Sequence, residues 1–196
     1  MLKKHPKDEL ATWNELQTAL RTRRLIRFSR RFEQFDIRGY VLDMGPKFFL
    51  LALVSDRIWL DGFDCFRLVD VKNVQNDKYA EFVESALNQR GEGIPPRPQV
   101  ELTNINSLLQ SANMSFPLIA IHREEVDSDV CHIGRVVDIG KGKVWLLEIG
   151  PDARWDAQPT EYRLDEITRV NFGGDYEGAL HLVGGEPASG YSDYLH

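Results

Sequence analysis

Two stretches of about 90 residues in this chain repeat one another, block by block and in the same order. The matched blocks are LQTA (16–19) with LQSA (109–112), GYVLDMG (39–45) with GRVVDIG (134–140), and FRLVDV (66–71) with YRLDEI (162–167). The separation grows only from 93 residues, between Leu16 and Leu109, to 97 residues, between Tyr79 and Tyr176. Ordered similarity at a nearly constant separation is typical of a duplicated structural unit. We therefore predict two copies of one unit.

The duplication divides the chain into four predicted parts. The first unit is expected at residues 1–90 and the second at residues 100–183. Residues 91–99 (GEGIPPRPQ) form a linker, because this segment is too rich in proline and glycine for a regular element. Residues 184–196 contain Gly, Pro and Ser and are expected to be a flexible tail. About 90 residues are enough for each unit to bury a core of its own.

Each copy opens with apolar side chains at helical spacing. One helix is expected at residues 8–21 with Asp8 as its N-cap, and another at residues 101–113 with Thr103 or Asn104 as its N-cap. The apolar side chains of the first helix are Leu10, Trp13, Leu16 and Leu20. We expect this stripe to face the core.

Five short strands follow the helix in each copy. The chain alternates apolar and polar residues from 25 to 32, and the most apolar strand lies at residues 47–54. A short sheet hides its edges best by curling, and Gly39 and Gly134 suit a bend in the second strand. The expected fold class is therefore mainly β: two repeated small five-stranded barrels, each with an N-terminal helix.

This pattern resembles the Sm-like family, a group of SH3-like barrels. The residues that carry the resemblance are an early glycine in strand two, an acidic residue after it, and an apolar strand. They are Gly39, Asp43 and residues 48–51 (FFLL) in the first copy, and Gly134, Asp138 and residues 144–147 (VWLL) in the second. The resemblance implies a tandem Sm-like protein, which would be expected to bind single-stranded RNA or to assemble with other barrels.

The sequence departs from the family at the two positions where its members bind RNA. The loop before the third strand holds Lys47 in one copy and Gly142-Lys143 in the other, in place of an asparagine. The turn between the last two strands is acidic, with Val69-Asp70 and Asp165-Glu166 in place of a basic residue and glycine. RNA binding would have to use other residues.

A cluster of basic residues in the first copy is the candidate nucleic-acid site. Its members are Arg23, Arg24, Arg27, Arg30, Arg31 and Lys47. Guanidinium groups interleaved with Phe28 and Phe32 could contact phosphates and stack on bases. The alternative is a solvated surface whose arginines pair with carboxylates, including those of the second copy.

Charge is divided unevenly between the copies and bears on the partner. Residues 1–100 carry 17 Lys and Arg against 14 Asp and Glu, a net charge of +3, whereas residues 101–196 carry 7 against 16, a net charge of −9. This asymmetry favours a protein partner or self-association over broad contact with nucleic acid. We therefore expect a non-enzymatic binding module, a protein-interaction or assembly scaffold, with RNA binding as the alternative.

No pattern in the sequence indicates catalysis, a metal or a cofactor, and we expect none of them. His122, His132 and Cys131 are of metal-ligand type, but they lack the spacing of a zinc site and are interpreted as two surface histidines and a buried thiol. A small hydrolytic or ligand-binding site in a cleft between the copies is a further possibility. The absence of a long apolar run predicts no membrane partner and a cytoplasmic protein.

Overall fold

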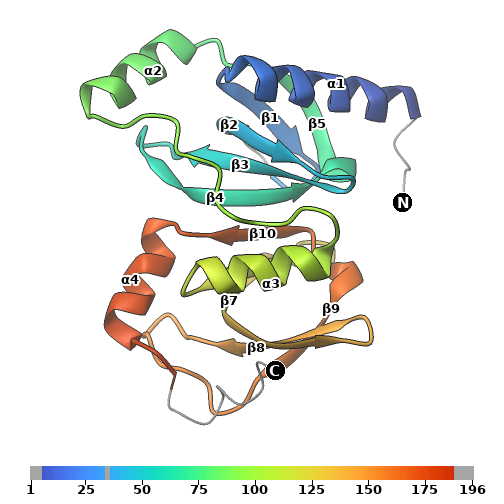
Figure 1. Cartoon of the computed structure of the whole chain (residues 1–196), viewed down its shortest axis with the longest axis vertical. Coiled ribbons are helices and arrows are strands. Elements are labelled where there is room, and N and C mark those ends of the chain that lie inside the picture. The colour runs from blue at the N-terminus through green and yellow to red at the C-terminus, as the bar shows by residue number, and fades with distance from the viewer. Residues whose placement is uncertain (1–5, 34–35, 188–196) are drawn as a thin grey trace. The chain divides into compact units, whose positions relative to one another are not determined.

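The computed structural model describes residues 6–33 and 36–187 of the chain. It consists of two compact units, Met1–Pro98 and Gln99–His196 (Figure 1). The described residues form more strand than helix, so the expectation of a mainly β protein is confirmed. No helix among residues 6–33 and 36–187 is both long and apolar enough to span a bilayer.

The first unit contains two helices, five strands and a 3-10 helix. Its elements are α1 (Pro6–Thr22), β1 (Ile26–Arg30), β2 (Ile37–Met44), β3 (Phe48–Val54), β4 (Leu60–Arg67), η1 (Leu68–Asp70), β5 (Val71–Asn76) and α2 (Ala80–Gln89). The strands pair antiparallel in the order β5-β1-β2-β3-β4.

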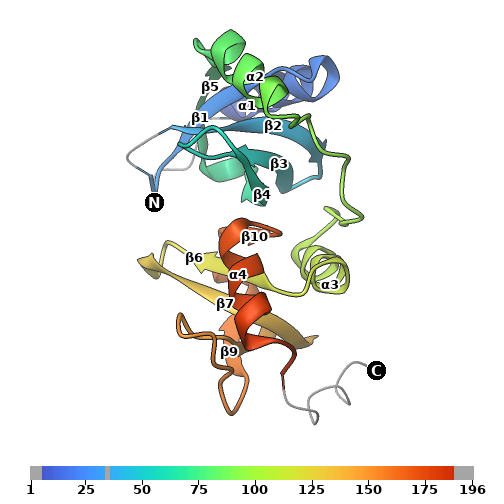
Figure 2. The same ribbon diagram turned by 90° about the vertical axis from the view of Figure 1, so that its left-hand side faces the viewer.

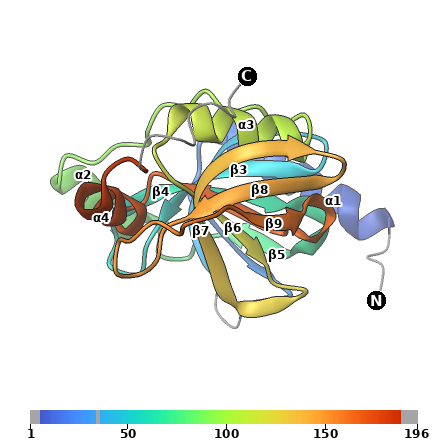
Figure 3. The ribbon, with the colours of Figure 1, turned by 90° about the horizontal axis from the view of Figure 1, so that it is seen from below.

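The second unit has the same sequence of elements. They are α3 (Ile105–Ser115), β6 (Ile119–Arg123), β7 (Asp127–Gly140), β8 (Lys143–Glu148), β9 (Thr160–Arg163), η2 (Leu164–Glu166), β10 (Arg169–Phe172) and α4 (Asp175–Gly184). Their strand order, β10-β6-β7-β8-β9, corresponds to that of the first unit. The hairpin of β6 and β7 extends away from the other strands of this unit (Figure 3).

The sheets are not closed into barrels, so this part of the fold prediction is wrong. Within each unit, the fourth and fifth strands stand at opposite ends of the strand order. The 3-10 helices η1 and η2 separate these strands and direct the fifth strand across the unit to pair with the first. Hydrophobic alternation indicates which face of a strand is buried. It does not indicate whether the fifth strand pairs with the fourth, which is the pairing that would close a barrel.

A cluster of phenylalanine rings forms the centre of the first unit. Phe28 of β1 contacts Phe49 of β3 and Phe66 of β4 edge-on, with ring centroids 5.4 and 5.3 Å apart. Leu16 and Ala19 of α1 belong to the same fully buried cluster. Burial of each such ring stabilises the fold by about 2 to 3 kcal/mol before entropic costs.

The closing helix of each unit packs on the sheet through a few apolar side chains. In the first unit, Val83 and Leu87 of α2 contact a buried cluster that includes Tyr40. In the second unit, Leu180 of α4 packs with Leu118 and with residues of β6 and β7 (Figure 2). Two helices therefore bracket the strands of each unit.

Gly39 and Gly134 lie where the second strand of each unit presses against the third. A Cβ atom at Gly39 would lie 2.3 Å from the carbonyl oxygen of Ala52, and one at Gly134 would lie 2.0 Å from that of Leu147. Backbone carbonyls cannot move aside as flexible side chains can. Both strands change register two to four residues later, which is the position of a β-bulge. These glycines permit the bend that the sequence predicted.

The two acidic residues that carried the resemblance close the bulge in the same way. Asp43 Oδ1 accepts a hydrogen bond from the backbone N–H of Met44, and Asp138 Oδ1 accepts one from that of Ile139, both at 2.8 Å. Asp43 also pairs with Arg97 at 2.6 Å. Both carboxylates thus have a structural role within their own unit.

Helix ends and the tail differ in part from expectation. Asn104 caps α3 by accepting a hydrogen bond from Ser107 N–H at 3.0 Å, as predicted. Asp8 is not an N-cap, because α1 already begins at Pro6. The tail was expected from residue 184, but α4 includes Gly184 and Glu186 pairs with Arg135. Residues 188–196 lie outside the described part of the chain.

We expect Gly39→Ala and Gly134→Ala each to lower the free energy of unfolding by about 2 to 3 kcal/mol, because the new methyl group meets a fixed carbonyl. Gly140→Ala is the matched control on β7, since a Cβ atom there meets nothing within 4 Å. Urea unfolding measures all three variants. Equal stability of Gly134→Ala and Gly140→Ala would contradict this account of the bend.

Candidate functional site

The predicted basic cluster is largely neutralised by carboxylates of the first unit itself. Arg24 pairs with Glu15 at 2.7 Å, Arg27 with Asp36 at 3.4 Å, and Arg31 with Asp70 at 2.9 Å. Arg30 pairs with Glu33. The arginines therefore find partners close by, and four of the six predicted residues are engaged before any ligand arrives.

Arg30 is also inaccessible to a nucleic acid. Its side chain is fully buried, and its guanidinium lies 4.6 Å from the centre of the Phe66 ring. It completes the aromatic core of the unit by a cation–π contact. A charge that is sequestered in this way cannot contact a phosphate without unfolding the strand.

Arg23 and Lys47 are the two predicted residues without an ion pair in residues 6–33 and 36–187. Arg23 lies after α1 in a left-handed backbone conformation, with φ of 52°. Lys47 lies in the turn between β2 and β3 and lines a groove. The structure thus gathers Arg24, Arg27, Arg30 and Arg31 into ion pairs and leaves Lys47 at a different feature of the surface.

This groove, the α1–η1 groove, is a concave and largely apolar surface of the first unit. Its volume is about 550 Å³. It is lined by Glu9, Leu10, Thr12 and Trp13 of α1, Pro46 and Lys47 of the β2–β3 turn, Phe48 of β3, Arg67 of β4, and Leu68 and Val69 of η1. The volume lies within the range of about 300 to 1,000 Å³ that is usual for binding pockets.

Two apolar side chains of the groove remain exposed to solvent. Leu10 is 62% exposed and Val69 is 52% exposed. The sequence stripe placed Leu10 and Trp13 in the core, but the residues of α1 that reach it are Leu16 and Ala19, with Leu20 packed against them. The helix extends beyond the sheet that it covers, and that overhang is not visible in the periodicity of the sequence.

Several positions that line this groove are polar in the second unit. Arg67 and Arg163 hold the same position in the matched blocks FRLVDV and YRLDEI. Phe48 pairs with Arg67 and Lys143 pairs with Arg163, so Phe48 of the first unit corresponds to Lys143 of the second. The central residue of the 3-10 helix is Val69 in one unit and Asp165 in the other. The helix repeat equates Trp13 with Asn106, and Leu10 has no helical counterpart, because Thr103 precedes α3. Three apolar positions of the groove are therefore polar in the second unit.

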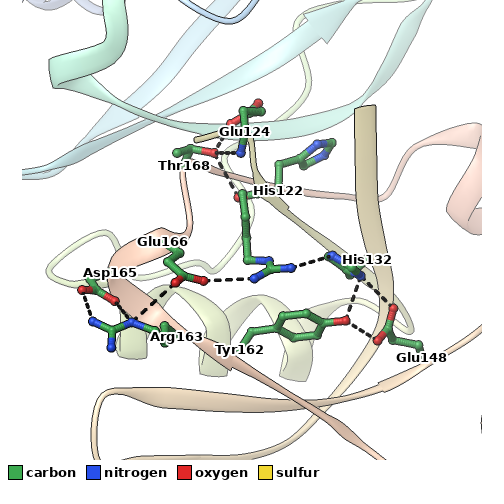
Figure 4. A network of polar contacts seen from close by, with 10 residues as sticks. His122, Glu124, His132, Glu148, Tyr162, Arg163, Asp165, Glu166 and Thr168 are labelled. Carbon is green, nitrogen blue, oxygen red and sulfur yellow. Dashed lines mark hydrogen bonds and ion pairs between the residues drawn. The ribbon is translucent and has the colours of Figure 1, made fainter. Parts of the chain in front are cut away.

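The second unit contains a network of polar side chains (Figure 4). His132 Nδ1 lies 3.0 Å from Glu148 Oε2 and 2.8 Å from the hydroxyl of Tyr162, which also donates a hydrogen bond to Glu148. Arg123 lies over the Tyr162 ring at 4.6 Å and pairs with Glu166 at 3.0 Å. These side chains connect β6, β7, β8, β9 and η2.

The network replaces part of the apolar core of the first unit. By strand register, the position of Ile37 in the first unit corresponds to that of His132 in the second, Leu53 corresponds to Glu148, and Phe66 corresponds to Tyr162. The arginine is retained, because Arg30 lies over Phe66 as Arg123 lies over Tyr162, at the same 4.6 Å. The second unit therefore has three polar groups where the first unit has three apolar ones.

The pKa shifts show that the network holds its charges in place. Burial alone would raise the pKa of Glu148, but hydrogen bonds with His132 and Tyr162 outweigh it and lower that pKa. Burial and the hydrogen bond to Glu148 raise the pKa of the Tyr162 phenol, so it stays protonated and donates. Each polar group is hydrogen-bonded to another member of the network, which is the arrangement of a structural network.

The histidines and cysteines differ from their sequence interpretation. His132 is mostly buried within the network rather than on the surface. Cys131 is exposed, so its interpretation as a buried thiol is wrong, whereas Cys65 is buried. Among residues 6–33 and 36–187, no group of three or more His, Cys, Asp and Glu residues could hold a metal ion.

We expect the triple variant His132→Ile/Glu148→Leu/Tyr162→Phe, which installs the residues of the first unit, to be at least as stable as the native chain. Glu148→Leu alone is expected to lower the free energy of unfolding by about 1 to 3 kcal/mol, because it leaves the partners of Glu148 unpaired. Urea unfolding compares the two. A triple variant less stable than Glu148→Leu would show that the two units are not equivalent at these positions.

We expect Glu148 to stabilise the fold increasingly as the pH rises. Since its pKa in the folded state is lowered, its contribution is fully present above its ordinary pKa of 4.5 and is lost as the pH falls through the folded value. The difference in unfolding free energy between the native chain and Glu148→Gln should therefore shrink on acidification. A difference that is constant from neutral pH to pH 3 would contradict the shift.

Comparison with known proteins adds no relative to this picture. No protein-family model matches the chain, and no curated protein or solved structure is significantly similar to it. What the chain does must therefore be inferred from its own residues, above all from the α1–η1 groove and the polar network.

Proposed function

We propose that this chain is a non-enzymatic binding module that receives a segment of another protein in the α1–η1 groove of its first unit. The segment inserts bulky apolar side chains between Leu10 and Trp13 on one wall and Val69 on the other. The rest of the chain is a scaffold of two Sm-like units that presents this groove.

The internal correspondence of the units supports a duplicated Sm-like fold. Both units have a helix, five strands with a 3-10 helix before the fifth, and the same strand order. Both have a glycine that admits close approach to the third strand, followed by an aspartate that closes a bulge. Duplication of one unit accounts for these shared local details more readily than independent origin of the two units does.

The observation that carries the binding proposal is the contrast between the two units. The second unit has Asn106, Lys143 and Asp165 where the groove has Trp13, Phe48 and Val69. Its helix α3 begins only at Ile105, so it has no helical counterpart of Leu10. Leu10 and Val69 of this groove stay exposed, and neighbouring apolar groups that stay exposed are typical of an interaction surface. Covering Leu10 and Val69 would contribute about 1 to 2 kcal/mol for each side chain.

RNA binding through the arginines of the first unit receives less support. Four of the six predicted residues are engaged with Glu15, Glu33, Asp36 or Asp70. A phosphate would have to displace these carboxylates, and the gain from each new ion pair would be offset by the loss of an old one. Titration with single-stranded RNA at low and moderate salt remains the direct check.

Selection of peptides on the native chain tests the proposal. A random 12-residue library displayed on phage should yield peptides rich in bulky apolar residues, and their synthetic forms should bind at micromolar concentrations in fluorescence anisotropy, as exposed grooves do. The matched variant is Leu10→Thr/Val69→Asp, which makes both exposed positions polar. Affinity is expected to fall at least tenfold, or about 1.4 kcal/mol, in that variant.

Both substituted side chains are exposed, so the variant should unfold at the same temperature as the native chain. That measurement separates a lost groove from a lost fold. A library that yields no binder, or binders that do not distinguish the variant, would show that the groove is not a docking surface.

A further inference from the structure

The tip of the β6–β7 hairpin has the composition of a ligand for the α1–η1 groove. Residues 126–130 read VDSDV. Val126 is 56% exposed and Val130 is 39% exposed, and Asp127 and Asp129 lie between them. Figure 3 shows the hairpin extending away from the other strands of its unit. Two exposed valines at such a tip are apolar surface that the second unit itself does not use.

The charges of the groove suit this segment. Lys47 lines the groove, and among residues 6–33 and 36–187 it has no ion pair. Arg67 lies on the same wall, because Phe48, the residue after Lys47, pairs with it across the strands. Asp70 is shared between Arg67 and Arg31, so one carboxylate faces two guanidinium groups. Glu9 lies on the opposite wall, which orients an acidic ligand toward Lys47.

The charge of the whole chain favours the same pairing. Residues 1–100, which contain the groove, have a net charge of +3, and residues 101–196, which contain the hairpin, have a net charge of −9. Opposite charges on two parts of one chain steer copies of it into head-to-tail contact. Hairpin and groove are different surfaces, so such a contact is heterologous and leaves one of each open.

We propose that the occupant of the α1–η1 groove is the β6–β7 hairpin tip of a second copy of this chain. Val126 or Val130 fills the space between Leu10 and Val69, and Asp127 or Asp129 pairs with Lys47. The inference rests on the proposed function of the groove and adds the identity of its partner. The chain would accordingly assemble head to tail, in a weak and salt-sensitive manner.

Complementation between two variants of the full chain tests the contact. Leu10→Thr/Val69→Thr disables the groove and keeps the hairpin, whereas Val126→Thr/Val130→Thr disables the hairpin and keeps the groove. Sedimentation equilibrium should show that the native chain associates as its concentration is raised toward about 1 mM, and that each variant alone remains monomeric. An equimolar mixture should form dimers and nothing larger, because only one contact can be made.

Charge reversal provides the second arm. Lys47→Glu should raise the dissociation constant of the native assembly at least tenfold, and the combined variant Lys47→Glu/Asp127→Lys/Asp129→Lys should restore it. Raising the salt concentration to about 0.5 M should weaken the native assembly, because it screens these pairs. The substituted side chains are exposed, and equal melting temperatures establish that all variants are folded.

A native chain that stays monomeric up to about 1 mM, or a mixture that stays monomeric while the native chain associates, would overturn the inference. The proposed function would survive the first result if selected peptides still bind the native chain and not Leu10→Thr/Val69→Asp. Assembly that depends on Leu10 and Val69 but not on the hairpin would place another segment of the second copy in the groove and would equally overturn the inference.

Discussion

The close approach of the second strand to the third determines the shape of each unit. Gly39 and Gly134 leave no room for a methyl group beside the carbonyl oxygens of Ala52 and Leu147. The bend that follows curls the sheet around Phe28, Phe49 and Phe66 in the first unit. It also sets the β2–β3 turn opposite α1, and this turn and helix form two sides of the α1–η1 groove.

One backbone thus supports two different interiors and two different surfaces. An arginine over an aromatic ring is common to both units, but the ring is Phe66 in one and Tyr162 in the other. A buried phenol needs a hydrogen-bond acceptor, which Glu148 supplies, and His132 completes the set. The first unit keeps an apolar interior and has gained an apolar groove, so each copy departs from the other in a separate place.

The arginine cluster illustrates how far a local pattern can be interpreted. Basic residues close together in the sequence predict a positive surface, yet Arg31 pairs with Asp70 of η1 and Arg27 pairs with Asp36, which lies just before β2. Pairing of β1 with both β2 and β5 brings these carboxylates to the arginines. Positive charge that is dense along the chain is therefore not dense on the surface.

The sequence by itself predicted the mainly β class and the bend glycines, and it offered Asn104 beside Thr103 as the cap of the second helix, because each depends on residues close together or on a simple pattern. Only the tertiary structure decided that the strand order stays open, that Leu10 lies beyond the sheet, and that His132 is enclosed by Glu148 and Tyr162. The path of the fifth strand and the overhang of α1 depend on how distant elements pack. Periodicity records which face of an element is apolar, and it carries no information about what that face will meet.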